Sequence, residues 1–181
     1  MSMTFILGGA RSGKSRLAQE LAAKLGKRVL FVATGEPLDE EMSARIKAHK
    51  RSRSPTWITL EAPTDVAKAL KGKIGGADVV IIDCMTLLVS NLMGTENVDA
   101  GTLEKRVSAE LKELVAVVKT TEAHFIIVSN EVGLGLVPPY PAGRVYRDAL
   151  GMANQLLAKN ADEVYLMIAG IPIELKKRES K

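Results

Sequence analysis

The sequence predicts an α/β fold, with a mostly parallel sheet flanked by helices, in a single domain over residues 1–181. Short β-branched and aromatic runs alternate with stretches of helical periodicity, which is typical of repeated βα units. Two of the runs, at 79–82 and 125–128, are apolar at every position, as expected for strands that are buried on both faces. No linker or low-complexity segment divides the chain.

The elements follow from these patterns in chain order. Strands are expected at residues 3–8, 28–33, 56–60, 78–83, 124–130, 163–169 and 171–175, and helices at 14–25, 39–51, 64–70, 102–119 and 144–159. The helix at 102–119 carries apolar residues three and four positions apart, which form one stripe. Glycine and proline predict a loop at 133–141. Arg144, Arg147 and Asp148 lie at one helix start, with Arg144 and Asp148 four residues apart, and are expected to serve an interface or local ion pairing. Trp57 is expected in the core.

The composition excludes several classes of protein. Hydrophobic residues make up 46% and charged residues 25% of the chain, which is neither a disordered nor a fibrous composition. Its one cysteine, Cys84, cannot form an internal disulfide, and two histidines are too few for a histidine-rich metal centre. The longest apolar stretch, 77–93, contains Asp78, Asp83, Ser90 and Asn91 and is a poor membrane span. Without a visible signal peptide, we expect a cytoplasmic protein.

The clearest motif is Gly8-Gly9-Ala10-Arg11-Ser12-Gly13-Lys14-Ser15, which matches the G-x-x-x-x-G-K-[ST] pattern of a phosphate-binding loop (P-loop). It follows an expected strand and opens an expected helix, so that its backbone N–H groups can surround a phosphate at a helix N-terminus. Lys14 is expected to reach the β- and γ-phosphates, and the Ser15 hydroxyl is expected to bind Mg²⁺. Asp83 ends an apolar strand and is the second candidate Mg²⁺ ligand.

The expected helix at 39–51 begins with acidic residues and ends with basic ones, as the helix dipole favours. His49 lies three residues after Ile46 and seven after Met42, so the three side chains share a face. One interpretation is a half-buried structural histidine. The other is a nucleophile, because an imidazole nitrogen can attack phosphorus at neutral pH. Cations that could neutralise a triphosphate there are Lys50, Arg51 and Arg53.

Together these segments resemble the bifunctional adenosylcobinamide kinase / adenosylcobinamide-phosphate guanylyltransferase family of cobalamin biosynthesis. The resemblance covers nearly the whole chain and rests on residues 8–15, 33–35, 39–42, 45–46, 49, 57–61, 83–86, 91–92, 129–133, 144–148, 151 and 154–155. It implies a RecA-like P-loop NTPase fold and a homotrimer. In this sequence Ala48 stands where some members have a second histidine, and Asp83 stands where some have glutamate.

The resemblance also implies two reactions. The first is phosphorylation of adenosylcobinamide by ATP or GTP. The second is transfer of GMP from GTP, through a covalent adduct on His49, to give adenosyl-GDP-cobinamide. Mg²⁺ is the implied metal. Beside the P-loop residues 8–15, the implied nucleotide contacts are Thr34, Gly35, Glu36, Lys50, Arg51, Ser52, Arg53, Glu61 and Asp83.

Two alternatives remain at this stage. A P-loop kinase with a single activity would form no covalent nucleotide adduct and would not need His49. A nucleic-acid-dependent ATPase would use the basic helix as a phosphate-backbone contact. The net charge of +4 and the aromatic content of 4% do not favour this last class, because few aromatic side chains are present to stack on bases. We therefore expect small-molecule partners and no nucleic acid.

Overall fold

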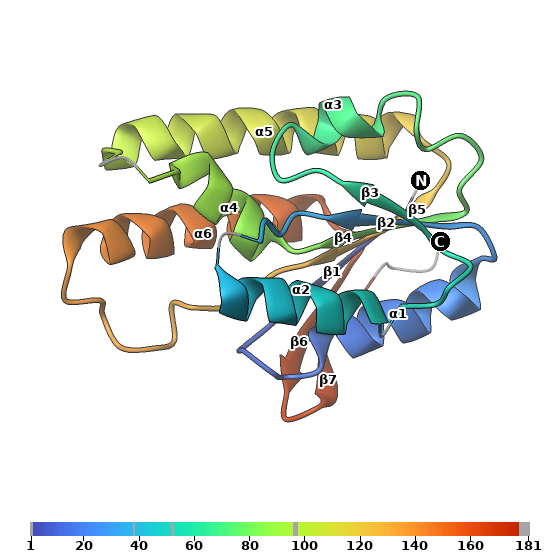
Figure 1. The fold of residues 1–181 in the computed structure, drawn as a ribbon, viewed down its shortest axis with the longest axis horizontal. Helices are drawn as coiled ribbons and strands as arrows, with labels where there is room; N and C mark the ends of the chain where they lie inside the picture. The colour runs from blue at the N-terminus through green and yellow to red at the C-terminus, as the bar shows by residue number, and fades with distance from the viewer. Residues whose placement is uncertain (1, 38, 52, 96–97, 178–181) are drawn as a thin grey trace.

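The structure is a computed structural model that describes residues 2–37, 39–51, 53–95 and 98–177. Within these residues a seven-stranded sheet has the strand order β3-β2-β4-β5-β1-β6-β7, and all neighbouring pairs are parallel except β6 and β7 (Figure 1). The strands are β1 (Ser2–Gly8), β2 (Val29–Ala33), β3 (Ile58–Glu61), β4 (Val79–Asp83), β5 (His124–Val128), β6 (Glu163–Ile168) and β7 (Ile171–Lys176).

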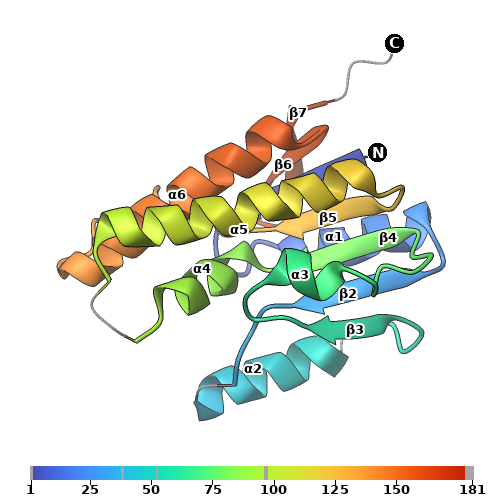
Figure 2. The same cartoon turned by 90° about the horizontal axis from the view of Figure 1, so that it is seen from above.

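Helices lie on both faces of the sheet, as Figures 1 and 2 show. They are α1 (Lys14–Leu25), α2 (Glu40–Arg51), α3 (Val66–Leu70), α4 (Met85–Met93), α5 (Ala100–Thr120) and α6 (Pro141–Asn160). The last four cover one face, whereas α1 and α2 lie on the side of the other face. Among the described residues, no helix has both the length and the apolar composition that crossing a membrane requires.

The central strands are buried on both sides, which explains their unbroken apolar runs. Along β5, Phe125 and Ile127 belong to the core beneath α3–α6, whereas Ile126 and Val128 belong to the core beneath α1. All four are at most 1% exposed. Successive side chains of a strand point to opposite faces of the sheet, and an apolar layer of helices covers each face.

The structure confirms the expected strands and the five expected helices, but it contains a further helix, α4, that the sequence patterns did not predict. Its residues 85–93 continue the apolar stretch that starts in β4, with no glycine or proline between them. Cys84 at its N-terminus makes no side-chain cap, so neither periodicity nor a capping residue marks the start of the helix. The first helical residue of α6 is Pro141, at a position that favours proline, rather than residue 144.

Two smaller expectations need correction. The local ion pair at the start of α6 forms between Arg147 and Asp148, which lie 3.4 Å apart, and not between Arg144 and Asp148. The guanidinium of Arg144 instead donates to the carbonyl oxygens of Pro138 and Pro139. Trp57 is only half-buried and packs on the edge of the core beside α1.

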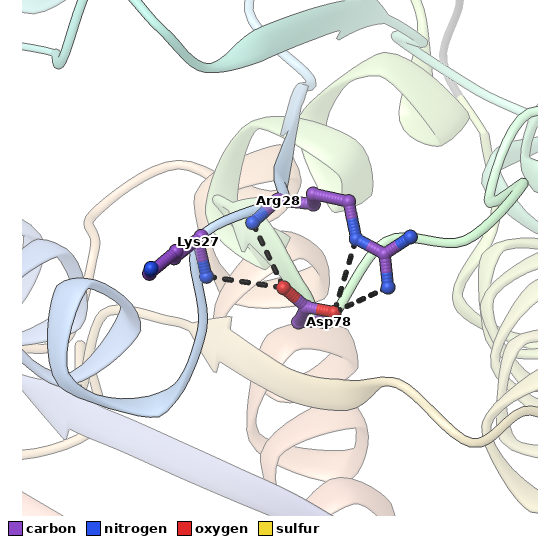
Figure 3. Close-up of polar contacts among 3 residues, drawn as sticks. All are labelled: Lys27, Arg28 and Asp78. Atoms are coloured by element: carbon purple, nitrogen blue, oxygen red, sulfur yellow. Dashed lines mark hydrogen bonds and ion pairs between the residues drawn. The ribbon is translucent and has the colours of Figure 1, made fainter.

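A single carboxylate, Asp78, ties the amino ends of two neighbouring strands together (Figure 3). Its Oδ2 accepts hydrogen bonds from the backbone N–H groups of Lys27 and Arg28, and its Oδ1 accepts two from the Arg28 guanidinium. These bonds, above all those from Arg28, lower the pKa of Asp78 to about 2. The approach is so close that a Cβ at Gly26 would lie 2.4 Å from the Cβ of Asp78.

Asp78→Asn is expected to lower the stability of the protein, and the loss should depend on pH. The pKa of Asp78 is lower in the folded chain than in the unfolded chain, so its contribution is complete above about pH 4 and declines as the pH falls toward 2. Urea unfolding of both proteins at pH 7, 5 and 3 measures this. The gap between them should be constant from pH 7 to 5 and narrower at pH 3. An equal gap at all three values would contradict the assignment.

Candidate functional site

The P-loop connects the end of β1 to the start of α1 and has the backbone of an anion site. Gly13 precedes α1 with φ of 96°, and Arg11 within the loop has φ of 57°. No side chain caps α1, and its first turn contains no acidic residue. Its first backbone N–H groups and the positive end of its dipole are therefore not neutralised by the helix itself. This arrangement is suited to a phosphate.

Lys14 is the buried cation of the loop, with 7% of the residue exposed. Its Nζ donates to the carbonyl oxygen of Gly9 at 2.6 Å and lies 3.5 Å from the Ser12 hydroxyl. Burial lowers the pKa of Lys14, and nearby groups, Asp83 among them, oppose that shift. The ammonium group therefore lies across the loop within the field of the Asp83 carboxylate.

Strand β6 and the turn that follows it pack against the P-loop, and the sequence did not predict this contact. The N–H of Gly170 donates to the carbonyl of Ser12 at 3.0 Å. A Cβ at Gly13 would lie 3.3 Å from the Cα of Gly170, and a Cβ at Gly8 would lie 2.5 Å from the carbonyl oxygen of Met167. The glycines of the motif thus serve close backbone packing as well as phosphate binding.

Asp83 stands at the carboxyl end of β4, in register with Ala33 of β2 and Val128 of β5. Its side chain is 9% exposed. Among the described residues, its Oδ2 is buried and has no hydrogen-bond partner. A buried carboxylate oxygen without a donor is costly unless a cation faces it.

Two side chains, an imidazole and a guanidinium, approach this carboxylate from α2 and the segment after it. His49 lies on the inward face of α2, as its spacing from Ile46 predicted, with Nδ1 3.9 Å from Asp83 Oδ2. Arg53 stacks its guanidinium 3.8 Å from the centre of the Phe31 ring. Burial lowers the pKa of Arg53, and the charges of Asp83 and Glu61 oppose that shift. Arg53 and Lys14 therefore both experience the negative charge of Asp83, and the His49 ring lies beside the same carboxylate.

The other predicted nucleotide residues differ in burial and in their partners. Lys50 Nζ pairs with Glu61 at 3.0 Å, and both side chains are largely exposed. With Lys47 and Arg51, Lys50 lines an open hollow of about 400 Å³ on the outward side of α2. Ser52 lies outside the described residues. Half-buried positions are Ser15, Gly35 and Glu36, and exposed ones are Gly9, Ala10 and Arg11.

Thr34 is fully buried, and its polar groups are used within the protein. Its hydroxyl donates to the carbonyl of Cys84 and accepts from the N–H of Cys84, and its own carbonyl accepts from Asn91. Asn91 also donates to the carbonyl of Pro63. The signal for this network was an asparagine inside the apolar stretch 77–93, because a polar side chain buried there needs partners.

Comparison with known proteins adds a family and several relatives. Residues 4–175 match the family model described as cobinamide kinase / cobinamide phosphate guanyltransferase. The chain is 36% identical to the bifunctional adenosylcobalamin biosynthesis protein CobU of Escherichia coli K12 and 38% identical to that of Salmonella typhimurium LT2. Both matches cover 96% of this chain and 99% of the relative. The bifunctional protein CobP of Pseudomonas aeruginosa PAO1 is 38% identical, with 94% and 95% covered.

The comparison with solved structures bears on the fold alone. The crystal structure of the RadB recombinase matches with a TM-score of 0.51 and 17% identity, over 91% of this chain and 73% of that one. RadB is RecA-like, so this likeness agrees with the expected RecA-like P-loop fold.

The two neighbouring glycines of the P-loop are expected to respond differently to alanine. Gly8 has φ of 153° and no room for a Cβ, whereas a Cβ at Gly9 meets nothing within 4 Å. Gly8→Ala should therefore lower the free energy of unfolding by on the order of 2 kcal/mol, and Gly9→Ala by less than about 0.5 kcal/mol. Urea unfolding of the two variants measures the difference. Equal effects would mean that the contact with Met167 of β6 does not constrain the loop at Gly8.

Proposed function

The chain belongs to the cobinamide kinase / cobinamide phosphate guanyltransferase family, whose members are transferases, and we propose that it performs both reactions at the edge that carries the P-loop. In the first, adenosylcobinamide receives a phosphate from ATP or GTP. In the second, the resulting phosphate receives GMP from GTP, by way of His49. The whole described chain would serve as one nucleotide-binding domain.

The observation that carries the proposal is the position of His49 beside Asp83. The buried Oδ2 of Asp83 lies 3.9 Å from Nδ1 of His49. A histidine with a purely structural role would not require a carboxylate at this position. A carboxylate on that side favours the tautomer with its proton on Nδ1. We therefore assign Nε2 as the nucleophilic nitrogen and Asp83 as the group that orients the ring.

In the proposed transfer, Nε2 of His49 attacks the α-phosphorus of GTP. A P–N bond forms, the bond from the α-phosphorus to the bridging oxygen breaks, and pyrophosphate leaves. An oxygen of cobinamide phosphate then attacks the same phosphorus, and the electron pair of the P–N bond returns to the imidazole. Arg53 and Lys14, which both experience the charge of Asp83, would stabilise the charge that develops on the phosphates.

For the kinase step we propose direct transfer of the γ-phosphate, with no covalent residue. The backbone N–H groups at the start of α1 would hold the phosphates. Lys14 would exchange its contact with the Gly9 carbonyl for a phosphate oxygen, a stronger partner because it is charged. Lys50 and Arg51, which face outward, are not needed at the reacting phosphorus and would act on the nucleotide from a distance.

Mg²⁺ is part of the proposal, and the residues present fit it. Mg²⁺ takes oxygen ligands, keeps several waters and uses one or two carboxylates together with substrate phosphates. The Ser15 hydroxyl and Asp83, whose Oδ2 has no donor among the described residues, would hold it. A bound Mg²⁺ neutralises phosphate charge. Across the residues that the structure describes, no three His, Cys, Asp or Glu side chains form a metal cluster.

His49→Ala is expected to abolish covalent labelling of the protein by α-³²P-GTP and to lower guanylyl transfer by at least about 1,000-fold. Denaturing electrophoresis measures the label, and a phosphoramidate should be labile to acid and stable to alkali. The control is His124→Gln, because His124 contacts Thr4 at the other end of the sheet and should keep the label. A wild-type protein that binds GTP without becoming labelled would favour the kinase with a single activity.

We also propose a homotrimer, which the family resemblance suggests. A surface suited to another copy is present on β7, an edge strand with all six residues exposed. Ile171, Ile173 and Leu175 form an apolar stripe along it. Light scattering of the purified protein should give a mass of three 19.5 kDa chains. A mass of one chain would refute the trimer.

A further inference from the structure

The segment between β5 and α6 exposes several large apolar side chains. Leu134 is 86% exposed, Leu136 96%, Val137 63% and Tyr140 62%. No residue from 132 to 140 carries a charge. We call residues 132–140 the apolar lip. Exposed apolar residues that stand singly are common, but a group of four in nine residues marks a binding surface.

Hydrogen bonds hold the lip at both ends, although its side chains reach into solvent. At its start, the N–H of Gly133 donates to the Glu131 carboxylate at 2.7 Å. At its end, Arg144 donates to the carbonyl oxygens of Pro138 and Pro139 at 3.0 and 2.9 Å. These bonds, with two successive prolines, restrict the backbone. The entropic cost of ordering the lip around a ligand is thereby reduced.

The lip begins beside the P-loop. The N–H of Glu131 donates to the carbonyl of Gly8, the first residue of the P-loop, at 3.1 Å. The N–H of Asn130 donates to the Thr86 hydroxyl, three residues after Asp83. Figure 1 shows the segment before α6 at the same edge of the sheet as the P-loop and the start of α2. The lip therefore continues the surface at which the nucleotide would react.

We propose that the apolar lip binds the acceptor, with Leu134, Leu136 and Val137 packed against the macrocycle of cobinamide. The proposal rests on the proposed function. The nucleotide is a polyanion, and the groups beside the P-loop that suit it are cations. The acceptor is a broad ring with methyl-bearing faces and neutral amides on its rim, so cations alone would recognise it poorly. An uncharged apolar surface next to the reacting phosphorus is complementary to such a ring.

The test is the direct binding of cobinamide to the protein. Equilibrium dialysis measures this binding, and the visible absorbance of the macrocycle gives the cobinamide concentration. Leu136→Ser and Leu134→Ser should each raise the Kd for cobinamide by about tenfold, since each removes an apolar side chain from the contact. The matched control is Leu25→Ser. Leu25 is also exposed, at 48%, but ends α1 away from the P-loop, and its replacement should leave the Kd unchanged.

Labelling by α-³²P-GTP in the absence of acceptor should be the same in both lip variants and the wild type, because the lip does not contact the nucleotide. The molecular mass from light scattering should also be unchanged. An unaltered Kd for cobinamide in both variants would overturn the lip proposal and leave the proposed function intact. A lowered mass would also overturn it, since the lip would then be a contact between copies. Lost labelling would overturn it as well, since the lip would then act on the nucleotide. Failure of the wild type to bind cobinamide at all would refute the acceptor assignment itself.

Discussion

Two hydrogen bonds between Thr34 and Cys84 hold the halves of the site together. The Thr34 hydroxyl donates to the Cys84 carbonyl at 2.7 Å and accepts from its N–H at 2.9 Å. Thr34 follows β2 and leads into α2, whereas Cys84 follows Asp83 at the end of β4. The bonds therefore fix the chain that carries His49 relative to the carboxylate. The attraction between His49 and Asp83 cannot do this, because His49 is 42% exposed and a pair at 3.9 Å is weak in water.

Much of this arrangement could be predicted from the sequence, and the failures have physical causes. α1 was placed at its observed bounds because a glycine loop precedes it and a glycine ends it. α4 was not predicted, because a helix that is apolar on most sides shows no amphipathic periodicity in its sequence. The inward position of His49 followed from its spacing to Ile46. The contact of Gly170 with the P-loop could not be predicted, since it joins residues more than 150 positions apart.

The basic residues near His49 divide into two groups, and helix geometry explains the division. Each residue turns an α-helix by about 100°, so Lys50 and Arg51, one and two positions after His49, leave its face. Arg53 follows the end of α2 and stacks on Phe31 of β2. Of these three cations, Arg53 lies near the Asp83 carboxylate. In the proposed function, the outward group, with Lys47, would supply a positive field that attracts a nucleotide and is screened by salt.

A surface that binds the acceptor through apolar contacts would also explain how one edge serves two reactions. The acceptor enters the kinase step as an alcohol and the transfer step as a phosphate, so its charge changes between them. Contacts with the macrocycle are the same in both steps, because the ring is unaltered. In the proposed arrangement, the charge would be added only at the end of the acceptor that faces Lys14 and Arg53, where cations are available for it. If the cations had to hold the whole acceptor, they would bind the alcohol weakly and the phosphate too tightly to release it. If the uncharged lip binds the ring, recognition of the acceptor does not depend on its change in charge. The cationic side chains can then act on the phosphorus that reacts.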